Sequence, residues 1–452
     1  MSSIFSIAAL LTGSALLLLA GGLHGLLLPL RGLSEGFSDS SLGLLGAGWA
    51  AGYMIGCLVV PMIVKRVGHT RSFGVLCSLA GITLLLNLLL MHPLAWIILR
   101  ALSGFCFAGA AMIVESWLNE RATSNTRGRI FGIYTMINLG ATTVGQMLLT
   151  VGDPTGFVFF IIGSIIYSLA LLPTALSTAA SPAPLTQARL DPKKLWKNSP
   201  IAVVGIFLVG ISNGAFGTLG AVYGRRIGLE VSDVAIMMSL ALLSGALIQL
   251  PVGYASDRLD RRIVLIAMAM AAMALGFCLT LFGGINPVAT IAMVAAFGGM
   301  IFSMQPVIVA HASDHAEPGE FLKTSGGLLL IYGIGTMVGP VAAAPLMTAT
   351  SPSALFQITA AAHLTIIVFA VWRMTQRAAV DADERTDFVP SLATGRYNTP
   401  ETSTMDPRYD EELEDQADSN DEAYHDPAVD EVRPEAPEAD PDGLNADAGK
   451  KI

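Results

Sequence analysis

One stretch sets the fold class of this chain: residues 232–262, which read SDVAIMMSLALLSGALIQLPVGYASDRLDRR. Residues 234–256 carry no charged side chain, and five charged residues then follow within residues 257–262. An α-helix rises about 1.5 Å per residue, so an uncharged run of this length crosses the ~30 Å hydrocarbon core of a bilayer. We therefore expect a membrane-spanning helix over residues 232–254 that ends in a charged loop.

The same pattern recurs along the chain, where apolar stretches alternate with charged or Gly- and Pro-rich breaks. The twelve expected spans are roughly residues 4–30, 41–63, 72–91, 94–118, 128–151, 155–176, 200–224, 232–254, 262–283, 287–310, 322–347 and 353–374. The first has no preceding Lys or Arg and no nearby small-residue cleavage site, so we interpret it as a retained helix rather than a signal peptide. The chain is accordingly expected to be an all-α integral membrane protein with twelve transmembrane helices.

The composition excludes an ordinary soluble protein. Of the 452 residues, 53% are apolar and 13% are charged, and the mean hydropathy is +0.61, whereas a soluble domain carries about 25% charged residues. Residues 381–452 hold 22 acids and 6 bases, and the remainder holds 13 acids and 20 bases. The pI of about 5.3 therefore belongs to the C-terminal tail, and the basic, apolar body does not indicate nucleic-acid binding.

The C-terminal segment, residues 377–452, combines many acids and several prolines with few large apolar side chains. Such a segment cannot bury enough surface to offset the entropy lost on ordering. We therefore expect a disordered tail on the cytoplasmic side. Two roles stay open for it: a solvated extension, or a segment that regulates the protein or binds an unidentified partner.

Basic side chains mark one side of the membrane. When the expected loops and ends are assigned alternately to two sides, one side carries 16 Lys and Arg and the other carries 3. Positively charged loops stay in the cytoplasm. We therefore expect a multi-pass protein of the inner (plasma) membrane with both termini in the cytoplasm.

The longest loop between spans, residues 177–199, divides the twelve spans into two sets of six. An offset of 194 residues aligns Gly104 with Gly298 and Gly145 with Gly339, which indicates an internal repeat. We expect two parallel six-helix halves, residues 1–176 and 200–376, joined by this cytoplasmic linker around a central axis.

Several chemistries are not indicated. The four cysteines lie inside apolar runs without a Cys-x-x-Cys pair, so no disulfide or zinc framework is expected. The Gly-x-Ser-x-Gly match at residues 210–214 falls inside a span, whereas a hydrolase needs it on a strand–turn–helix. His311, Asp314 and His315 have a helical spacing suited to a metal, but no further ligands accompany them. No metal, cofactor or enzymatic activity is expected.

Four motifs resemble a known family. Residues 253–262, GYASDRLDRR, are similar to the Gly-x-x-x-Asp-Arg-x-x-Arg-Arg loop of the major facilitator superfamily, and residues 100–104, RALSG, are similar to its Arg-x-x-x-Gly motif in helix 4. Within that superfamily, residues 65–71 and 115–121 (KRVGHTR and ESWLNER) resemble the bacterial YcaD-like group. The resemblance covers about residues 1–376 and implies alternating access by two rocking six-helix halves.

The chain departs from the pattern of that family in two places. Lys65 stands where the first-half loop of the family usually carries Asp. Residues 138–146 lack the Gly-Pro pair that is common in the proton-driven drug antiporters of the family, and a Gly339-Pro340 pair stands in the eleventh span instead. The antiporter type is therefore left open.

Ionisable side chains inside spans are costly, so each one is informative. His24, Arg100 and Gln146 lie at similar depths in spans one, four and five, which the resemblance implies line the cavity. We expect this polar layer to contact the substrate or to carry coupling protons. The alternatives are a neutral His24 packed between helices and an Arg100 that pairs with backbone carbonyls or polar neighbours.

Three more polar side chains lie near the middle of their spans: Asn138, Asn213 and Tyr332. We expect them to line the cavity too, although such groups inside a membrane often only join helices.

Charged residues near the boundaries of the spans are expected to form gates. Glu115, near the cytoplasmic end of span four, is expected to pair with one of three bases in the adjacent loop: Lys65, Arg66 or Arg71. A proton carrier and a merely solvated helix end are the alternatives for Glu115.

The second expected gate lies after span eight. Asp257 can meet Arg261, Arg262 or the positive N-terminus of span eleven in the loop that also holds Arg258. Such a contact is expected to hold the outward-facing state.

The function that these features favour is a secondary active transporter of a small solute, coupled to the proton gradient because no nucleotide-binding loop is present. Its expected partners are the bilayer, the solute and protons. Scattered amides and hydroxyls favour an uncharged or amphipathic solute, and Arg100 leaves an anion open. The alternative is a membrane-embedded ligand sensor that signals through the acidic tail.

Overall fold

All regular structure in the described residues is helical, as the sequence predicts. The computed structural model describes residues 2–175, 182, 185, 191–317, 319–381, 385–390 and 398–409. Its elements are α1 (Ser2–Ser34), α2 (Asp39–Val67), α3 (His69–Leu89), α4 (Pro93–Glu120), α5 (Ser124–Met147), η1 (Leu148–Val151), α6 (Val158–Ala175), α7 (Pro192–Asn198), α8 (Pro200–Arg226), α9 (Val231–Arg258), α10 (Arg261–Phe282), α11 (Pro287–Ser313), α12 (Phe321–Ala349), α13 (Ala354–Met374) and α14 (Pro400–Thr404).

Within this described part of the chain, 10 helices are long and apolar enough to cross a membrane. The stretch Val158–Thr174 in α6 is apolar but shorter. Helix α5 stands outside this set because serines, threonines, arginines and amides interrupt its apolar residues. Several of its polar side chains form hydrogen bonds with other helices.

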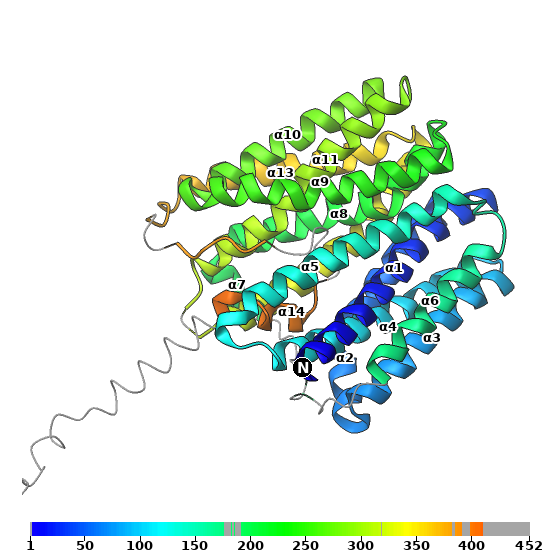
Figure 1. The fold of residues 1–452 in the computed structure, drawn as a ribbon. Coiled ribbons are helices and arrows are strands. Elements are labelled where there is room, and N and C mark those ends of the chain that lie inside the picture. The colour runs from blue at the N-terminus through cyan, green and yellow to red at the C-terminus, as the bar shows by residue number, and fades with distance from the viewer. Residues whose placement is uncertain are drawn as a thin grey trace, which may run out of the picture.

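The long helices pack in two groups, α1–α6 and α8–α13, which lie side by side (Figure 1). We call them the N-terminal group and the C-terminal group. In the N-terminal group α2 packs on α4, and α1 packs on α5 and α6. In the C-terminal group α9 packs on α11, and α8 packs on α12 and α13. The two groups thus repeat the same order of neighbours.

Glycines permit the closest helix crossings in both groups. A Cβ on Gly104 would overlap a backbone carbonyl of α2, and one on Gly298 would overlap a backbone carbonyl of α9. Gly145 and Gly339 meet carbonyls of α1 and α8 in the same way. The residues that the 194-residue offset aligns therefore make equivalent backbone-to-backbone contacts, which small residues allow in membranes.

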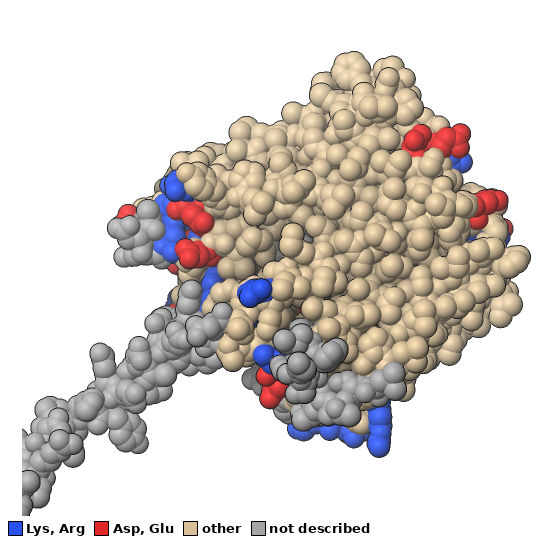
Figure 2. All heavy atoms as spheres, viewed as in Figure 1, with Lys and Arg blue, Asp and Glu red and all other residues tan. Residues whose placement is uncertain are grey.

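On the face that Figure 2 shows, charged side chains gather at two ends of the molecule and leave a broad, largely uncharged belt between them. One end carries the basic loops at residues 65–71, 121–129 and 258–262, and we call it the basic end. The other, where α2 begins at Asp39 and α8 ends at Arg226, is called the opposite end. The uncharged belt is the surface that a bilayer requires.

The tail differs from the expected disordered segment in two stretches. Residues 385–390 and 398–409 pack against the helices at the basic end, and α14 lies among them (Figure 1). Residues 385–409 hold only three acids and three bases, whereas 410–452 hold 16 acids and three bases. The tail is acidic on average, but this portion of it is neutral. Its apolar side chains, such as Phe388 and Val389, pack against the helices. Residues 382–384, 391–397 and 410–452 of the expected tail lie outside the described residues.

Candidate functional site

A cavity between the two groups is the main candidate site. Helices of both groups line it, and its polar wall consists of Arg100, Thr142, Gln146, Tyr167, Asn213 and Thr218. Its apolar wall includes Trp49, Phe107, Met238, Leu242 and Phe302. Such a mixture, mostly apolar with a few convergent polar groups, is typical of a small-molecule site.

Arg100 supplies the charge of this central cavity. The residue is only 7% exposed, and its guanidinium carbon lies 5.7 Å from the centre of the Trp49 ring. Gly25 of α1 faces it, and a Cβ at that position would lie 3.7 Å from a guanidinium nitrogen. The planar guanidinium thus lies between α1 and Trp49, where it offers several donors to the cavity.

Two predicted amides also line the central cavity. The Oε1 atom of Gln146 accepts a hydrogen bond of 3.1 Å from Ser239, which joins α5 to α9 across the two groups. The Nδ2 atom of Asn213 donates to the Tyr332 hydroxyl over 3.2 Å. The structure thus brings Arg100, Gln146 and Asn213 to one cavity.

The other predicted polar residues lie around the central cavity rather than in its wall. His24 is fully buried, and its Nδ1 lies 3.4 Å from the hydroxyl of Tyr167, which does line the cavity. Asn138 accepts a 2.8 Å hydrogen bond from Ser14. Tyr332 lines a smaller adjoining cavity between α2 and α12. These contacts join helices, which was the alternative considered for such groups.

A seal of polar contacts closes the opposite end. The buried Asp39 carboxylate of α2 accepts from Arg226 of α8 over 2.7 Å and from Thr348 of α12 over 3.0 Å. Nearby, Gly43 and Gly46 let α2 approach α12 and α8 closely. Sequence reasoning used Asp39 for no functional role. An acid at the start of an apolar span, on the side with few bases, was the available signal.

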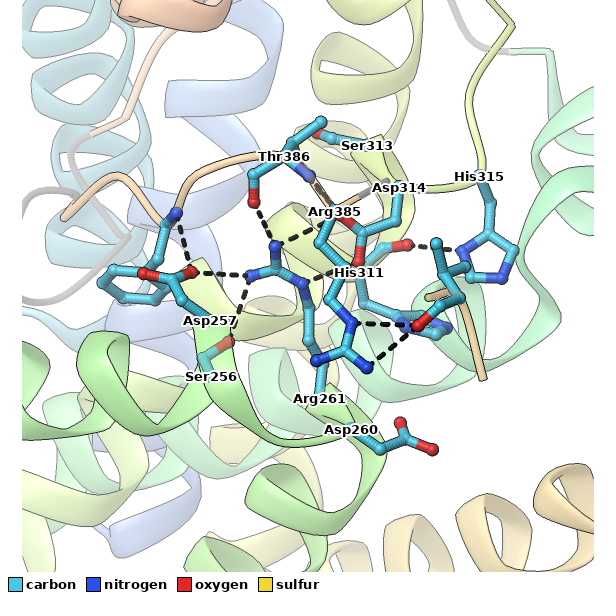
Figure 3. A network of polar contacts seen from close by, with 12 residues as sticks. Ser256, Asp257, Asp260, Arg261, His311, Ser313, Asp314, His315, Arg385 and Thr386 are labelled. Atoms are coloured by element: carbon cyan, nitrogen blue, oxygen red, sulfur yellow. Dashed lines mark hydrogen bonds and ion pairs between the residues drawn. The ribbon is translucent and has the colours of Figure 1, made fainter. Parts of the chain in front are cut away.

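At the basic end, Arg261 organises the polar network of the C-terminal group (Figure 3). Its Nε donates to Asp314 over 2.7 Å and its Nη1 donates to Ser256 over 3.0 Å. The expected partner Asp257 lies 3.7 Å from Nη1. Arg261 therefore does approach Asp257, but its shortest ion pair is with Asp314, from the end of α11.

The neighbouring bases make other contacts. Arg262 pairs with Asp260 over 2.7 Å, and Arg258 stacks 3.5 Å from the centre of the Tyr254 ring. Burial acts to raise the pKa of Asp260, but the hydrogen bonds and charge of Arg262 outweigh it and hold that pKa below its usual value. Arg262 is thus occupied by Asp260 rather than by Asp257.

Glu115 does not pair with any of the bases that were expected to be its partners. The carboxylate is fully buried and accepts a 2.8 Å hydrogen bond from Tyr134, while the three expected bases, Lys65, Arg66 and Arg71, are exposed. In the described part of the chain, none of these bases forms an ion pair with Glu115. The Glu115 side chain instead faces α5 and the tail, which supply its hydrogen-bond partners.

The remaining partners of Glu115 come from the tail. Thr402 donates to it over 3.0 Å, and the Thr399 hydroxyl donates to its other oxygen. Sequence reasoning missed both threonines. The available signal was Thr399-Pro400, because a hydroxyl residue followed by proline is typical of a helix start.

Comparisons with known proteins give a consistent result. The family model described as Major Facilitator Superfamily matches residues 10–320 and 202–395. An uncharacterized MFS-type transporter of Enterobacter sp. (strain 638) is 28% identical over 356 residues, covering 77% of this chain and 90% of that protein. The uncharacterized MFS-type transporter YcaD of Escherichia coli O7:K1 is 26% identical over 368 residues, with the same coverage.

Solved structures share the fold at low identity. The nucleoside transporter NupG has a TM-score of 0.67 at 14% identity, covering 82% of this chain and 98% of that one. A bacterial homolog of the lysosomal transporter Spinster, in an inward-facing and occupied conformation, has a TM-score of 0.60 at 16% identity, covering 85% of this chain and 98% of that one.

Proposed function

The chain belongs to the Major Facilitator Superfamily, and on that premise we propose that it moves a small solute through the central cavity by alternating access, as a secondary active transporter. The predicted resemblance to the YcaD-like group is confirmed by the relatives, and this family points to a membrane transporter rather than an enzyme. The sensor alternative gains no support from the comparisons.

The proposed architecture has twelve spans in two six-helix halves, residues 1–176 and 200–376, with α5 and α6 as spans besides the 10 apolar helices. The equivalent glycine crossings of the two groups support it. We place the basic end in the cytoplasm of a cell with an inner membrane, because positively charged loops stay there. Both termini then lie in the cytoplasm.

The observation that carries the proposal is the position of Arg100. It lies seven residues after the start of α4, about 10 Å along the helix at 1.5 Å per residue. A charge at mid-span costs about 2.5–3.5 kcal/mol on insertion scales. A cation kept at this depth, in the wall of a cavity between two groups, suits a substrate site. It favours a polar or amphipathic solute, or one with an anionic group for the guanidinium fork.

The conformation is proposed to be inward-facing. The Asp39–Arg226 pair and the Gln146–Ser239 hydrogen bond join the two groups toward the opposite end. At the basic end, the space between the groups is wide enough to hold α14. Alternating access would then require the seal at the opposite end to break.

Coupling to protons is proposed as the energy source. Glu115 supports it, since a buried carboxyl group whose hydrogen-bond partners are all hydroxyls can gain or lose a proton without leaving an ion-pair partner behind. The absence of a nucleotide-binding loop in the sequence is consistent with this choice.

The test starts with purified full-length protein and a compound screen by thermal shift. Compounds that raise the melting temperature are then offered, radiolabelled, to proteoliposomes with and without an imposed pH gradient. The proposal expects saturable uptake that depends on the gradient. Uptake that ignores the gradient would contradict proton coupling alone, whereas stabilising compounds that never cross the membrane would contradict the transporter itself.

A further inference from the structure

The first described stretch of the tail, residues 385–390, contacts the C-terminal group near the loop between α9 and α10. The backbone N–H of Phe388 donates to Asp257 over 3.1 Å, and the hydroxyl of Thr386 donates to Asp314 over 2.9 Å. Arg261 donates to the carbonyl oxygen of Thr386 (Figure 3). Three charged groups that organise the basic end of this group therefore also hold the tail.

A notch in α9 accepts the Phe388 side chain. Gly253 lies directly beneath the ring, and a Cβ at that position would overlap it. The glycine of the 253–262 motif thus provides the surface on which the tail lies. Val389 and Pro390 follow and line a cavity between the tail and the helices.

Residues 398–409 then enter the opening between the two groups. The Tyr53 hydroxyl of α2 donates to the carbonyl oxygen of Asn398 over 3.1 Å. Tyr53 is 14 residues from the end of α2 at Val67, about 21 Å along the helix at 1.5 Å per residue. The tail therefore reaches to about the middle of the expected membrane.

From there the chain turns back as α14 and contacts both groups. Thr399 and Thr402 donate to Glu115 of α4, and Asn119 donates to Thr404 over 3.2 Å. On the other side, α14 packs on α12. Arg408, just after α14, lies 5.1 Å from the centre of the Phe321 ring at the start of α12.

We propose that residues 385–390 and 398–409 form an inhibitory plug that fills the cytoplasmic opening of the inward-facing transporter and must leave before that opening can close. The inference rests on the proposed alternating access. Closure at the basic end requires the two groups to approach each other, and α14 occupies that space. The plug also engages Asp257, the acid expected to stabilise the outward-facing form.

The chemistry of the contacts favours a plug that can be released. Residues 385–409 are neutral overall, and their contacts with Glu115 come from hydroxyl groups rather than from a base. Neutral hydrogen bonds contribute little net stability because water replaces them on release.

Docking is tested by the labelling of a cysteine beneath the plug. Ser325 of α12 is buried and lines the cavity with Asn398, Thr399 and Thr402. In full-length protein carrying Cys57→Ala, Cys278→Ser and Ser325→Cys, a maleimide added at the basic end should react slowly. Adding Thr399→Val with Thr402→Val should speed it about tenfold, the factor that the loss of two hydrogen bonds of ordinary net strength gives.

Thr375→Val is the matched control, since Thr375 is exposed and its hydroxyl bonds only to its sequence neighbours Trp372 and Gln376 at the end of α13. It should leave the rate unchanged. A second, independent change is Gly253→Ala, which removes the notch. Gly253→Ala should raise the labelling rate of Ser325→Cys when the tail is wild type. It should cause no further increase in protein that already carries Phe388→Ala. Equal rates in all variants would overturn the docking of the plug.

Inhibition is tested from the opposite end. Ala221 of α8 lines the central cavity behind the seal, so Ala221→Cys reports outward opening, and Asp39→Asn serves as the reference that breaks the seal. The Thr399→Val and Thr402→Val pair should raise the labelling of Ala221→Cys from outside severalfold. A rise in the reference alone would overturn the inhibitory role and leave the transporter standing. A reference that does not rise would contradict alternating access, and the inhibitory role with it.

Discussion

Arg100 is the residue on which substrate binding is expected to depend most. Arg100→Lys keeps the charge but loses the planar five-donor fork, so we expect weakened binding of the compounds found by thermal shift. Arg100→Ala loses both, and the ligand-induced shift in melting temperature should vanish. The melting temperature without ligand distinguishes substrate binding from a purely structural role. If Arg100 only holds helices together, Arg100→Ala should lower that temperature as well.

Arg373→Ala is the control for that series, because Arg373 lies at the end of α13 beside Trp372, away from the central cavity. It should bind the same compounds normally. A full ligand-induced shift in the Arg100→Ala protein would remove Arg100 from the site.

Asp39 is expected to govern the seal at the opposite end. Asp39→Asn removes the buried carboxylate charge that faces Arg226 and leaves a weaker hydrogen bond from the guanidinium, which costs about 1–3 kcal/mol. That is enough to shift a two-state balance of a few kcal/mol toward the outward-facing form. Labelling of Ala221→Cys from outside measures the change.

The matched control for Asp39 is Glu35→Gln. The Arg31–Glu35 ion pair, at 2.7 Å, lies within α1 and its following turn and so does not cross between the groups. Equal labelling in the Asp39→Asn and Glu35→Gln proteins would contradict the role assigned to the seal.

Site residues were easiest to predict from the sequence where a single polar side chain stands inside an otherwise apolar span. Arg100, Gln146 and Asn213 were predicted for the cavity because polar groups are rare there, and they do line it. The partners of Glu115 were not predictable, since Thr399 is 284 positions away in the sequence and lies in a segment whose average composition indicates disorder. Pairing of Asp39 with Arg226 depends on how the two groups meet, which no local pattern encodes.

At the scale of elements, glycine crossings should decide stability. A Cβ on Gly145 of α5 would overlap a carbonyl of α1, whereas Gly140, on the same helix, has nothing within 4 Å of that position. Gly145→Ala should therefore destabilise the protein by about 1–3 kcal/mol through overpacking, and Gly140→Ala should be tolerated. Melting temperatures in detergent compare the two; equal values would contradict the close crossing.

The positions of helices were largely predictable, because a membrane demands long apolar runs with polar ends. Every expected span contains a helix, and Gly335 and Gly339 pack against α8 as close-packing glycines do. Helix α14 was not predicted: it has only five residues, Pro400–Thr404, and so offers no apolar period. Its helix forms where it is bound, between α4 and α12.

In the proposed transport cycle of the whole molecule, the two groups exchange contacts at one end for contacts at the other. The present contacts include the seal at Asp39, the cavity wall at Arg100 and the plug at Glu115. If the groups move as rigid bodies, opening at one end must accompany closing at the other. That reciprocity separates alternating access from simple loosening.

Pulsed electron resonance between spin labels on the two groups tests this reciprocity most directly. Exposed sites are available at the opposite end, Val151 and Ile285, and at the basic end, Thr70 and Leu259. The protein is reconstituted in proteoliposomes with Asp39→Asn, Thr399→Val and Thr402→Val. These changes should lengthen the distance between Val151 and Ile285 and shorten the distance between Thr70 and Leu259. Distances that stay fixed, or that both lengthen, would contradict alternating access between the two groups.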